Sequence, residues 1–238
     1  MGCRSKYLPL AYPIKGLKSE NGKQAQPYQL LVNLFLLRRF AGYADEFVKP
    51  VFINKGQQGF IFRFEHNKRD LCLKLFYDYQ APYTVQERTL AFICPFACES
   101  RAFARLCDLH ENGHWAVQCH GWMYLTDSQL QQLQRVSGRE RHDPNWNNAR
   151  WAIVKDFIAE DPLSRQDEGF QQIVSNFAIP RRGRLMPQDV KKANYRGSLI
   201  VDLGSTFTFP FYRSYASLYE FNAVYKSLDE YGLPDWDY

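Results

Sequence analysis

The 238-residue sequence lacks several features that each identify a class of protein. It contains no run of about 18 apolar residues, so we expect neither a transmembrane helix nor a membrane partner. Its cysteines form no C-x-x-C pair and have no His at zinc-finger spacing, which gives no basis for a zinc site. No Ser lies in a G-x-S-x-G context, so we nominate no covalent nucleophile.

The opening residues bear on lipidation and on the compartment. Met1-Gly2-Cys3 is followed by Lys6 where the myristoylation pattern requires Ser or Thr, so we expect no acyl anchor. No apolar signal segment opens the chain, and we therefore expect reduced thiols and a cytoplasmic protein.

The composition is that of an ordered globular protein, with 45% hydrophobic, 16% aromatic and 23% charged residues. The length suits one sizeable domain or two small lobes that share a cleft. Lys and Arg outnumber Asp and Glu by 30 to 25, which gives a formal net charge of +5. Such an excess supports a phosphate or RNA partner only where the basic residues cluster.

Apolar periodicity and turn residues divide the chain into predicted elements. Residues 1–27, rich in Pro, Gly, Lys and Gln, are expected to form an irregular arm, and residues 28–40 a buried helix. The remaining predictions, in chain order, are strands at 51–54, 60–65 and 71–77 in an antiparallel meander, a helix at 95–112, a strand at 116–125, a helix and an exposed loop within 126–150, a strand at 151–159, a helix at 166–178, a hairpin at 195–201 and a helix at 215–230.

A Lys on a predicted strand and a Glu early in the next helix form the first part of a candidate site. Lys74 is flanked by apolar residues, so its ammonium would be poorly solvated unless a carboxylate or phosphate meets it. Glu99 is the nearest suitable partner in this order of elements, and a Gly-containing loop at 54–59 precedes both. An ion pair with a purely structural role is the alternative.

Asp189, Asn194 and Asp202 form the second part of the candidate site. An Asp and an Asn five residues apart, followed by an Asp after a hydrophobic strand, can converge on one cation or hydroxyl. Phosphoryl transfer needs such groups, with a carboxylate at the attacking hydroxyl and with Asn and Asp on the metal. Turn formation, which Asp and Asn both favour, is the alternative.

The order of Gly-containing loop, strand Lys, helix Glu, D-x-x-x-x-N and D-L-G resembles the protein-kinase superfamily over residues 54–204. The resemblance implies an α+β, reduced protein-kinase-like fold with an antiparallel-sheet N-lobe at 28–155 and a small, mainly helical C-lobe at 156–238. Gln188 stands where protein kinases usually carry Arg, and no A-P-E motif follows Asp202. We therefore expect most of the platform that docks a protein substrate to be absent.

Segments such as E-S-R-A-F-A-R-L and D-V-K-K-A-N-Y-R-G-S-L-I-V-D-L-G-S-T are similar to a fungal kinase-like family whose members are often labelled as kinetochore complex subunits. The resemblance extends to the fungal arginine-containing cyclodipeptide synthases, which join arginine and a second amino acid from aminoacyl-tRNAs and carry an acidic D-D-x-x-E type motif. Asp156 and Glu160 match its outer acids, whereas Phe157 replaces the second. The resemblance implies that both acids bind the arginine side chain; solvated surface acids are the alternative.

Basic residues gather in one late segment of the chain. They are Arg181, Arg182, Arg184, Lys191, Lys192 and Arg196. Such a cluster would suit the acceptor stem of a tRNA or nucleotide phosphates. A solvated basic surface is the alternative.

Three hypotheses of function follow. The leading one is a tRNA-dependent cyclodipeptide synthase of fungal secondary metabolism that uses arginyl-tRNA and a second aminoacyl-tRNA, with no cofactor, metal or DNA partner. An acid of the Asp189/Asp202 set would be its general base. The alternative is an ATP-dependent small-molecule phosphotransferase, in which Lys74 binds ATP phosphates while Asn194 and Asp202 bind Mg²⁺. The third is a non-catalytic kinase-like scaffold subunit, against which the full set of five polar residues counts.

Overall fold

The computed structural model of the protein describes residues 37–79, 92–211, 216–233 and 236. The predicted irregular arm and most of the helix predicted at 28–40 lie outside these residues. The described end of that helix is wrong, because Arg39 forms a parallel β-bridge with Trp122 instead. Within the described residues, no helix is long and apolar enough to cross a membrane.

One antiparallel sheet organises the first half of the described chain, and its strands run in the order β1-β2-β3-β5-β4. The strands are β1 (Val48–Lys55), β2 (Gly59–His66), β3 (Arg69–Phe76), β4 (Cys119–Tyr124) and β5 (Trp151–Asp156). The predicted meander is confirmed, since β1 pairs with β2 and β2 with β3, all antiparallel. Asn67 and Lys68 make the tight β2–β3 turn with φ of 51° and 62°.

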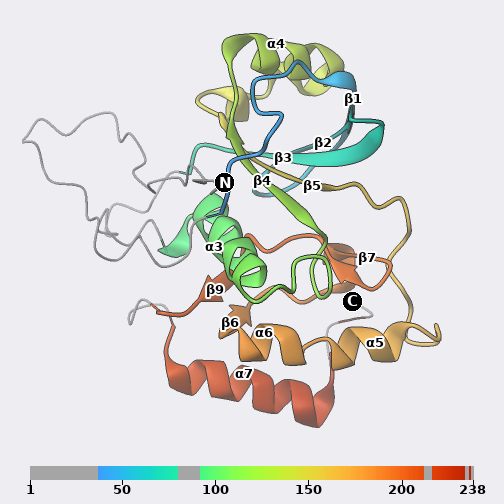
Figure 1. Cartoon of the computed structure of the whole chain (residues 1–238), viewed down its shortest axis with the longest axis vertical. Helices are drawn as coiled ribbons and strands as arrows, with labels where there is room; N and C mark the ends of the chain where they lie inside the picture. The colour runs from blue at the N-terminus through green and yellow to red at the C-terminus, as the bar shows by residue number, and fades with distance from the viewer. Residues whose placement is uncertain (1–36, 80–91, 212–215, 234–235, 237–238) are drawn as a thin grey trace, which may run out of the picture.

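Helices and two small sheets account for the rest of the fold (Figure 1). The helices are α3 (Pro95–Asp108), α4 (Asp127–Val136), α5 (Phe170–Ser175), α6 (Ala178–Arg182) and α7 (Leu218–Tyr231), with 3-10 turns η1 (Gly138–His142), η2 (Pro144–Trp146) and η3 (Lys192–Asn194). The small sheets pair β6 (Leu185–Pro187) with β9 (Thr206–Thr208) and β7 (Tyr195–Arg196) with β8 (Leu199–Ile200). The described chain is therefore a mixed α/β protein.

The five-stranded sheet separates two hydrophobic cores. On one face, here called the α4 face, Phe60, Leu73 and Val154 pack with residues of α4 and with Trp146, whose ring stacks on Phe60 at 4.3 Å. On the other face, the α3 face, Ile153 joins a core shared with α3 and with the C-terminal elements. Figure 1 shows α4 on one side of the sheet and α5, α6 and α7 on the other. Because side chains alternate along a strand, each strand contributes to both cores.

Helix α3 is the element that joins the sheet to the C-terminal part of the chain. Pro95 occupies its first turn, where the missing N–H costs nothing, as the sequence predicts. The helix ends at Asp108, earlier than the predicted residue 112, because His110 adopts a φ of 59° that breaks the helix. Arg101 in its middle donates to the carbonyl oxygens of Thr208 and Pro210, at 2.8 and 3.2 Å.

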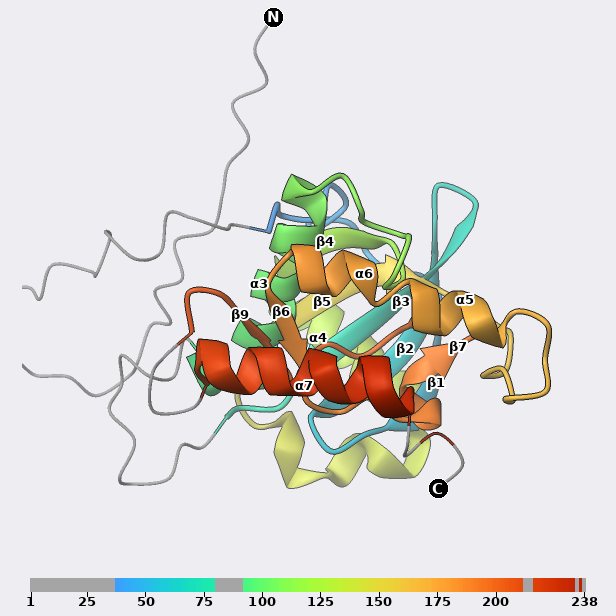
Figure 2. The ribbon, with the colours of Figure 1, turned by 90° about the horizontal axis from the view of Figure 1, so that it is seen from below.

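The C-terminal elements follow the sequence predictions in part, and the pairing of β6 with β9 was not predicted. The helix predicted at 166–178 is two short helices, because α5 ends at Ser175 and Pro180 then lies in the first turn of α6, where no N–H is required. The predicted hairpin is confirmed as β7–β8, and the predicted last helix is α7. Figure 2, seen from below, shows α7 running across the base of the molecule.

Candidate functional site

Lys74 on β3 lies at the centre of a polar cluster on the α3 face of the sheet. Its ammonium donates to Glu99 Oε2 at 2.9 Å, to Asp202 Oδ1 at 2.6 Å and to Gln58 Oε1 at 3.1 Å. The Lys74 side chain is 3% exposed and that of Glu99 is fully buried. The predicted Lys74–Glu99 ion pair is therefore present.

A second lysine completes this cluster. Lys155 on β5 donates to Glu99 Oε1 at 2.6 Å and to the Val201 carbonyl oxygen at 2.7 Å. Burial alone would lower the pKa of Lys155, but the Glu99 carboxylate, with Cys72 and Asp202, keeps that pKa above its usual value. Each oxygen of Glu99 thus accepts from a different buried ammonium. We refer to Lys74, Glu99, Lys155 and Asp202 as the ion cluster.

Asp202 is held as a carboxylate by this arrangement. Burial would raise its pKa, yet the charges of Lys74 and Lys155 and the hydrogen bonds from Lys74 and from the Gly204 N–H lower the pKa to about 2. A carboxylate with so low a pKa is a weak proton acceptor at neutral pH. The structure therefore places the Asp202 carboxylate in a charge pair with Lys74.

Gln58 closes the β1–β2 loop onto the segment that follows Asp202. Its amide oxygen accepts from Lys74, and its amide nitrogen donates to Ser205 Oγ at 3.2 Å. A Cβ atom at Gly204 would overlap the Gln58 amide, so a larger residue there would displace this side chain from its present position. The predicted Gly-containing loop is present and lies against the D-L-G segment.

Asp189 and Asn194 lie beside the ion cluster but are not part of it. The Asn194 amide donates to the Asp189 carbonyl oxygen at 2.8 Å, and the Val201 N–H donates to the Asn194 carbonyl oxygen at 2.8 Å. The Asp189 side chain is 44% exposed and pairs with Lys191 at 3.0 Å. These contacts order a turn, and they leave Asp189 as the most accessible acid of the predicted catalytic set.

Asp156 and Glu160 occupy a different environment from the ion cluster. Asp156 Oδ1 meets Arg69 Nη2 at 3.1 Å and His120 Nε2 at 2.6 Å. Asp156 follows Lys155 at the end of β5, and successive strand residues point to opposite faces. Glu160 is exposed, and its carboxylate lies against Gly197. The structure therefore brings Lys74, Glu99 and Asp202 together, and it directs Asp156 away from them.

Three of the six basic residues pair with acids. Arg181 pairs with Asp229 on α7, Arg182 with Glu111, and Lys191 with Asp189. The Arg184 guanidinium lies over the Phe209 ring, at 4.8 Å from its centroid, and Arg196 donates to the Tyr195 carbonyl oxygen at 2.6 Å. Lys192 begins the 3-10 turn η3. Acids of the protein itself therefore balance half of the six positive charges that were predicted to attract phosphates.

No group of three or more His, Cys, Asp or Glu side chains is placed to bind a metal ion in the described part of the chain. The Mg²⁺ ligands of the phosphotransferase hypothesis would be Asn194 and Asp202. Asp202 Oδ1 already accepts from Lys74 and from the Gly204 N–H. The five described cysteines are free thiols.

Sequence reasoning missed Gln58, Lys155, Arg69 and His120 as members of polar sites. The signal for Lys155 was present, because it lies among apolar residues on a strand in the same way as Lys74. The roles of Arg69 and His120 follow only from the pairing of β3, β4 and β5, which one sequence does not give.

The comparisons with known proteins support a family but no activity. The model of the family described as Kinetochore Sim4 complex subunit FTA2 matches residues 36–207, well over half of the chain. The protein belongs to this family, which confirms the expected likeness to proteins labelled as kinetochore subunits. No curated protein matches the chain. The kinase-like and cyclodipeptide synthase parts of the resemblance stay predictions.

The ion cluster predicts an order of stability losses. We expect Glu99→Ala to lower the free energy of unfolding by about 3–5 kcal/mol, because it leaves Lys155 buried without its carboxylate. Lys155→Met should cost less, since Glu99 keeps Lys74 as its partner. Urea denaturation measures both values. Glu65→Ala, which removes the exposed partner of Lys49, is the control and should cost only about 0–1 kcal/mol. Equal losses for Glu99→Ala and the control would contradict this account.

The lowered pKa of Asp202 predicts a pH dependence. The folded-state pKa of about 2 lies below the usual value of 3.8, so the ionised carboxylate stabilises the fold above the usual value. That stabilisation is lost as the pH falls from about 4 towards 2. We expect the difference in unfolding free energy between wild type and Asp202→Asn to be constant near neutral pH and to shrink in this window. If the difference between wild type and Asp202→Asn is the same at all pH values, the pKa of Asp202 is not lowered in the folded protein.

Proposed function

We propose that the chain has a reduced protein-kinase-like fold and acts as a non-catalytic subunit of a protein assembly. The kinase-like interpretation is supported by the strand order β1-β2-β3-β5-β4, by the Lys74–Glu99 pair between β3 and α3, and by Asp202 beside Lys74. The observation that carries the non-catalytic part is the saturation of Lys74.

A lysine ammonium has three N–H donors. In Lys74 the three acceptors are the side chains of Gln58, Glu99 and Asp202, each within 3.1 Å. A phosphate group that bound Lys74 would compete with these three acceptors, and only the neutral Gln58 amide could leave without unpairing a charge. Lys155, which has no place in the phosphotransferase hypothesis, neutralises the second oxygen of Glu99. The cluster therefore holds two ammonium groups and two carboxylates in balance.

A scaffold has a structural use for these polar residues. The ion cluster links β3 and β5 of the sheet to α3 and to the segment at Val201 and Asp202. Asp189 and Asn194 order the turn beside it. The family is described as a subunit of a kinetochore complex, which supports a role in protein assembly.

Magnesium-dependent ATP binding separates this proposal from the phosphotransferase. A ligand at about one hundred times its Kd stabilises a protein by ~2.7 kcal/mol, which a thermal melt detects. We expect millimolar ATP with Mg²⁺ to leave the melting temperature of the full chain unchanged. An increase that needs Mg²⁺, and that Asp202→Asn abolishes, would favour the phosphotransferase. The product of a small-molecule phosphorylation assay would then identify the reaction.

A matched variant tests the scaffold role in the cell. Asp189 is the accessible acid that either enzyme hypothesis would use as base, and its replacement by Asn preserves shape. We expect a tagged Asp189→Asn chain to recover the same stoichiometric partner proteins as wild type. Loss of a small-molecule product in that strain, with partners unchanged, would instead point to catalysis.

A second candidate is the tRNA-dependent synthase of an arginine-containing cyclic dipeptide. The observation in its favour is Asp156, which already accepts the guanidinium of Arg69 at 3.1 Å, and bidentate Arg–carboxylate pairs are strong and selective. Glu160 lies four residues further along. Asp189 would be the general base, because the pKa of Asp202 is too low for that role.

Mass spectrometry of cultures that express the chain tests this second candidate. The synthase reading requires a cyclic Arg-X dipeptide that is absent from empty-vector cultures. Asp156→Ala and Glu160→Ala should abolish it, whereas Asp127→Ala, which changes an acid with an 83% exposed side chain on α4, should not. On our main proposal, no such product forms while soluble protein is present.

A further inference from the structure

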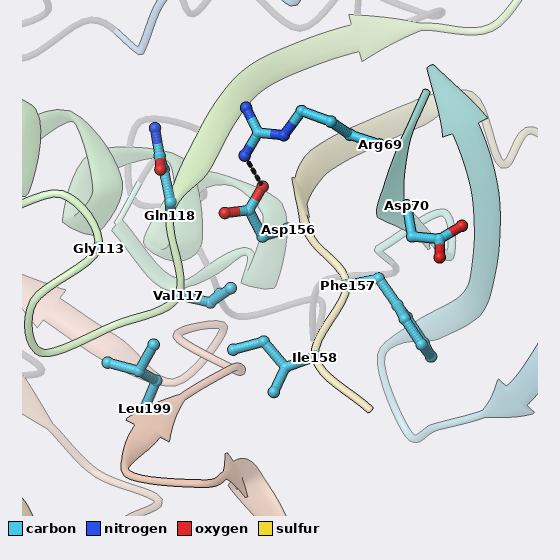
Figure 3. A pocket seen from close by; sticks show the side chains of 9 residues that line it. All are labelled: Arg69, Asp70, Gly113, Val117, Gln118, Asp156, Phe157, Ile158 and Leu199. Atoms are coloured by element: carbon cyan, nitrogen blue, oxygen red, sulfur yellow. Dashed lines mark hydrogen bonds and ion pairs between the residues drawn. The ribbon is translucent and has the colours of Figure 1, made fainter. Parts of the chain in front are cut away.

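A pocket of about 450 Å³ lies at the end of β5, apart from the ion cluster. Its wall comes from the start of β3, from the segment between α3 and β4, from the end of β5 and the residues that follow it, and from β8. The lining residues are Arg69, Asp70, Gly113, Val117, Gln118, Asp156, Phe157, Ile158 and Leu199 (Figure 3). Its volume lies in the range that proteins use for small ligands.

The pocket presents a negative and a positive group side by side, and a second acid, Asp70, also lies in its lining. Asp156 and Arg69 are joined at 3.1 Å, and Figure 3 shows them together at one side of the pocket. The Arg69 and His120 contacts both end on Asp156 Oδ1, which leaves Oδ2 for a ligand. A guanidinium carries five N–H donors, and the Arg69 side chain is 59% exposed, so it has donors to offer as well.

The opposite side of the pocket is apolar. Val117, Ile158 and Leu199 lie together below the charged pair in Figure 3. Val117 is buried, and its N–H donates to the Ile200 carbonyl oxygen at 3.0 Å, which fixes this part of the wall. Ile158 and Leu199 are half-buried, so a ligand that covered them would remove apolar surface from water.

These features together define the charge pattern of a ligand. An acid and a guanidinium in direct contact match an ammonium and a carboxylate that are carried on the same carbon atom. An apolar surface close to that pair matches a hydrocarbon side chain on the same carbon. A nucleotide fits poorly, because Asp156 and Asp70 would repel its phosphates.

We propose that this pocket binds a free α-amino acid with an apolar side chain. The ligand ammonium pairs with Asp156 Oδ2, its carboxylate takes N–H donors of Arg69, and its side chain packs on Val117, Ile158 and Leu199. This binding site is additional to the proposed scaffold function and does not depend on it. Since Asp156 and Lys155 point to opposite faces of β5, the pocket can fill without disturbing the ion cluster.

Isothermal titration of the full chain with leucine, methionine and phenylalanine tests the proposal. We expect saturable one-to-one binding of at least one of them with a Kd on the order of 0.1–1 mM, the range that a ligand of about nine non-hydrogen atoms supports. N-acetyl-leucine amide, which carries neither charge, should bind at least about tenfold more weakly, because it leaves the polar groups unpaired.

Variants locate the binding to this pocket. Arg69→Gln should weaken leucine binding at least about tenfold through loss of the carboxylate partner. Leu199→Trp should abolish it by filling the apolar side. Lys68→Gln, which changes an exposed charge in the turn directly before Arg69, is the matched control and should leave the Kd unchanged.

Several outcomes would overturn the proposal. These are the absence of binding by all three amino acids, equal binding of N-acetyl-leucine amide, or an unchanged Kd in a folded Leu199→Trp protein. Tighter binding of arginine than of leucine would also overturn it. That result would assign Asp156 to a guanidinium and would strengthen the synthase candidate.

Discussion

The buried carboxylate of Glu99 is the interaction on which the rest of the structure depends. It lies fully inside the protein, and an uncompensated charge there would cost several kcal/mol. Each of its oxygens therefore accepts from a lysine, Lys74 on β3 and Lys155 on β5. Because the two lysines come from neighbouring strands and the acid from α3, this single group fixes the helix against the sheet. Lys155 also donates to the Val201 carbonyl oxygen, which extends the constraint to the C-terminal part of the chain.

The same constraint limits what the cluster can do chemically. On the scaffold proposal, the charges that compensate one another at 2.6–2.9 Å hold the surrounding elements together. Asp202 illustrates this, since the lysines that stabilise its ionised form also lower its pKa to about 2. Lys, Glu and Asp side chains of the kind used in phosphoryl transfer can therefore also hold a helix against a sheet when a second lysine, here Lys155, balances their charge. On the scaffold proposal, Lys155 shifts the balance of charge in the cluster towards a structural role.

The sequence predicted the part of the site that depends on local pattern. Lys74 within an apolar strand and Glu99 in the first turns of a helix were correctly paired, because a buried ammonium requires a carboxylate. The strands of the meander and the later helices were also predicted, since their periods and turn residues are local signals. The sequence carries less information about which side chains contact each other across distant segments. Asp156 was expected to bind an arginine side chain together with Glu160. In the structure Arg69 and His120 contact Asp156, and those contacts depend on strand pairing between distant segments.

The register of β5 explains how one strand serves two unlike environments. Lys155 and Asp156 are consecutive, so one faces Glu99 and the other faces Arg69. A slip of β5 by one residue would exchange them and place the Asp156 carboxylate against that of Glu99. Two like charges in a buried site cannot both stay ionised, so the slipped register is strongly disfavoured. The pair of opposite charges therefore specifies the pairing of β5 more firmly than its apolar residues alone, and the positions of both sites follow from that register.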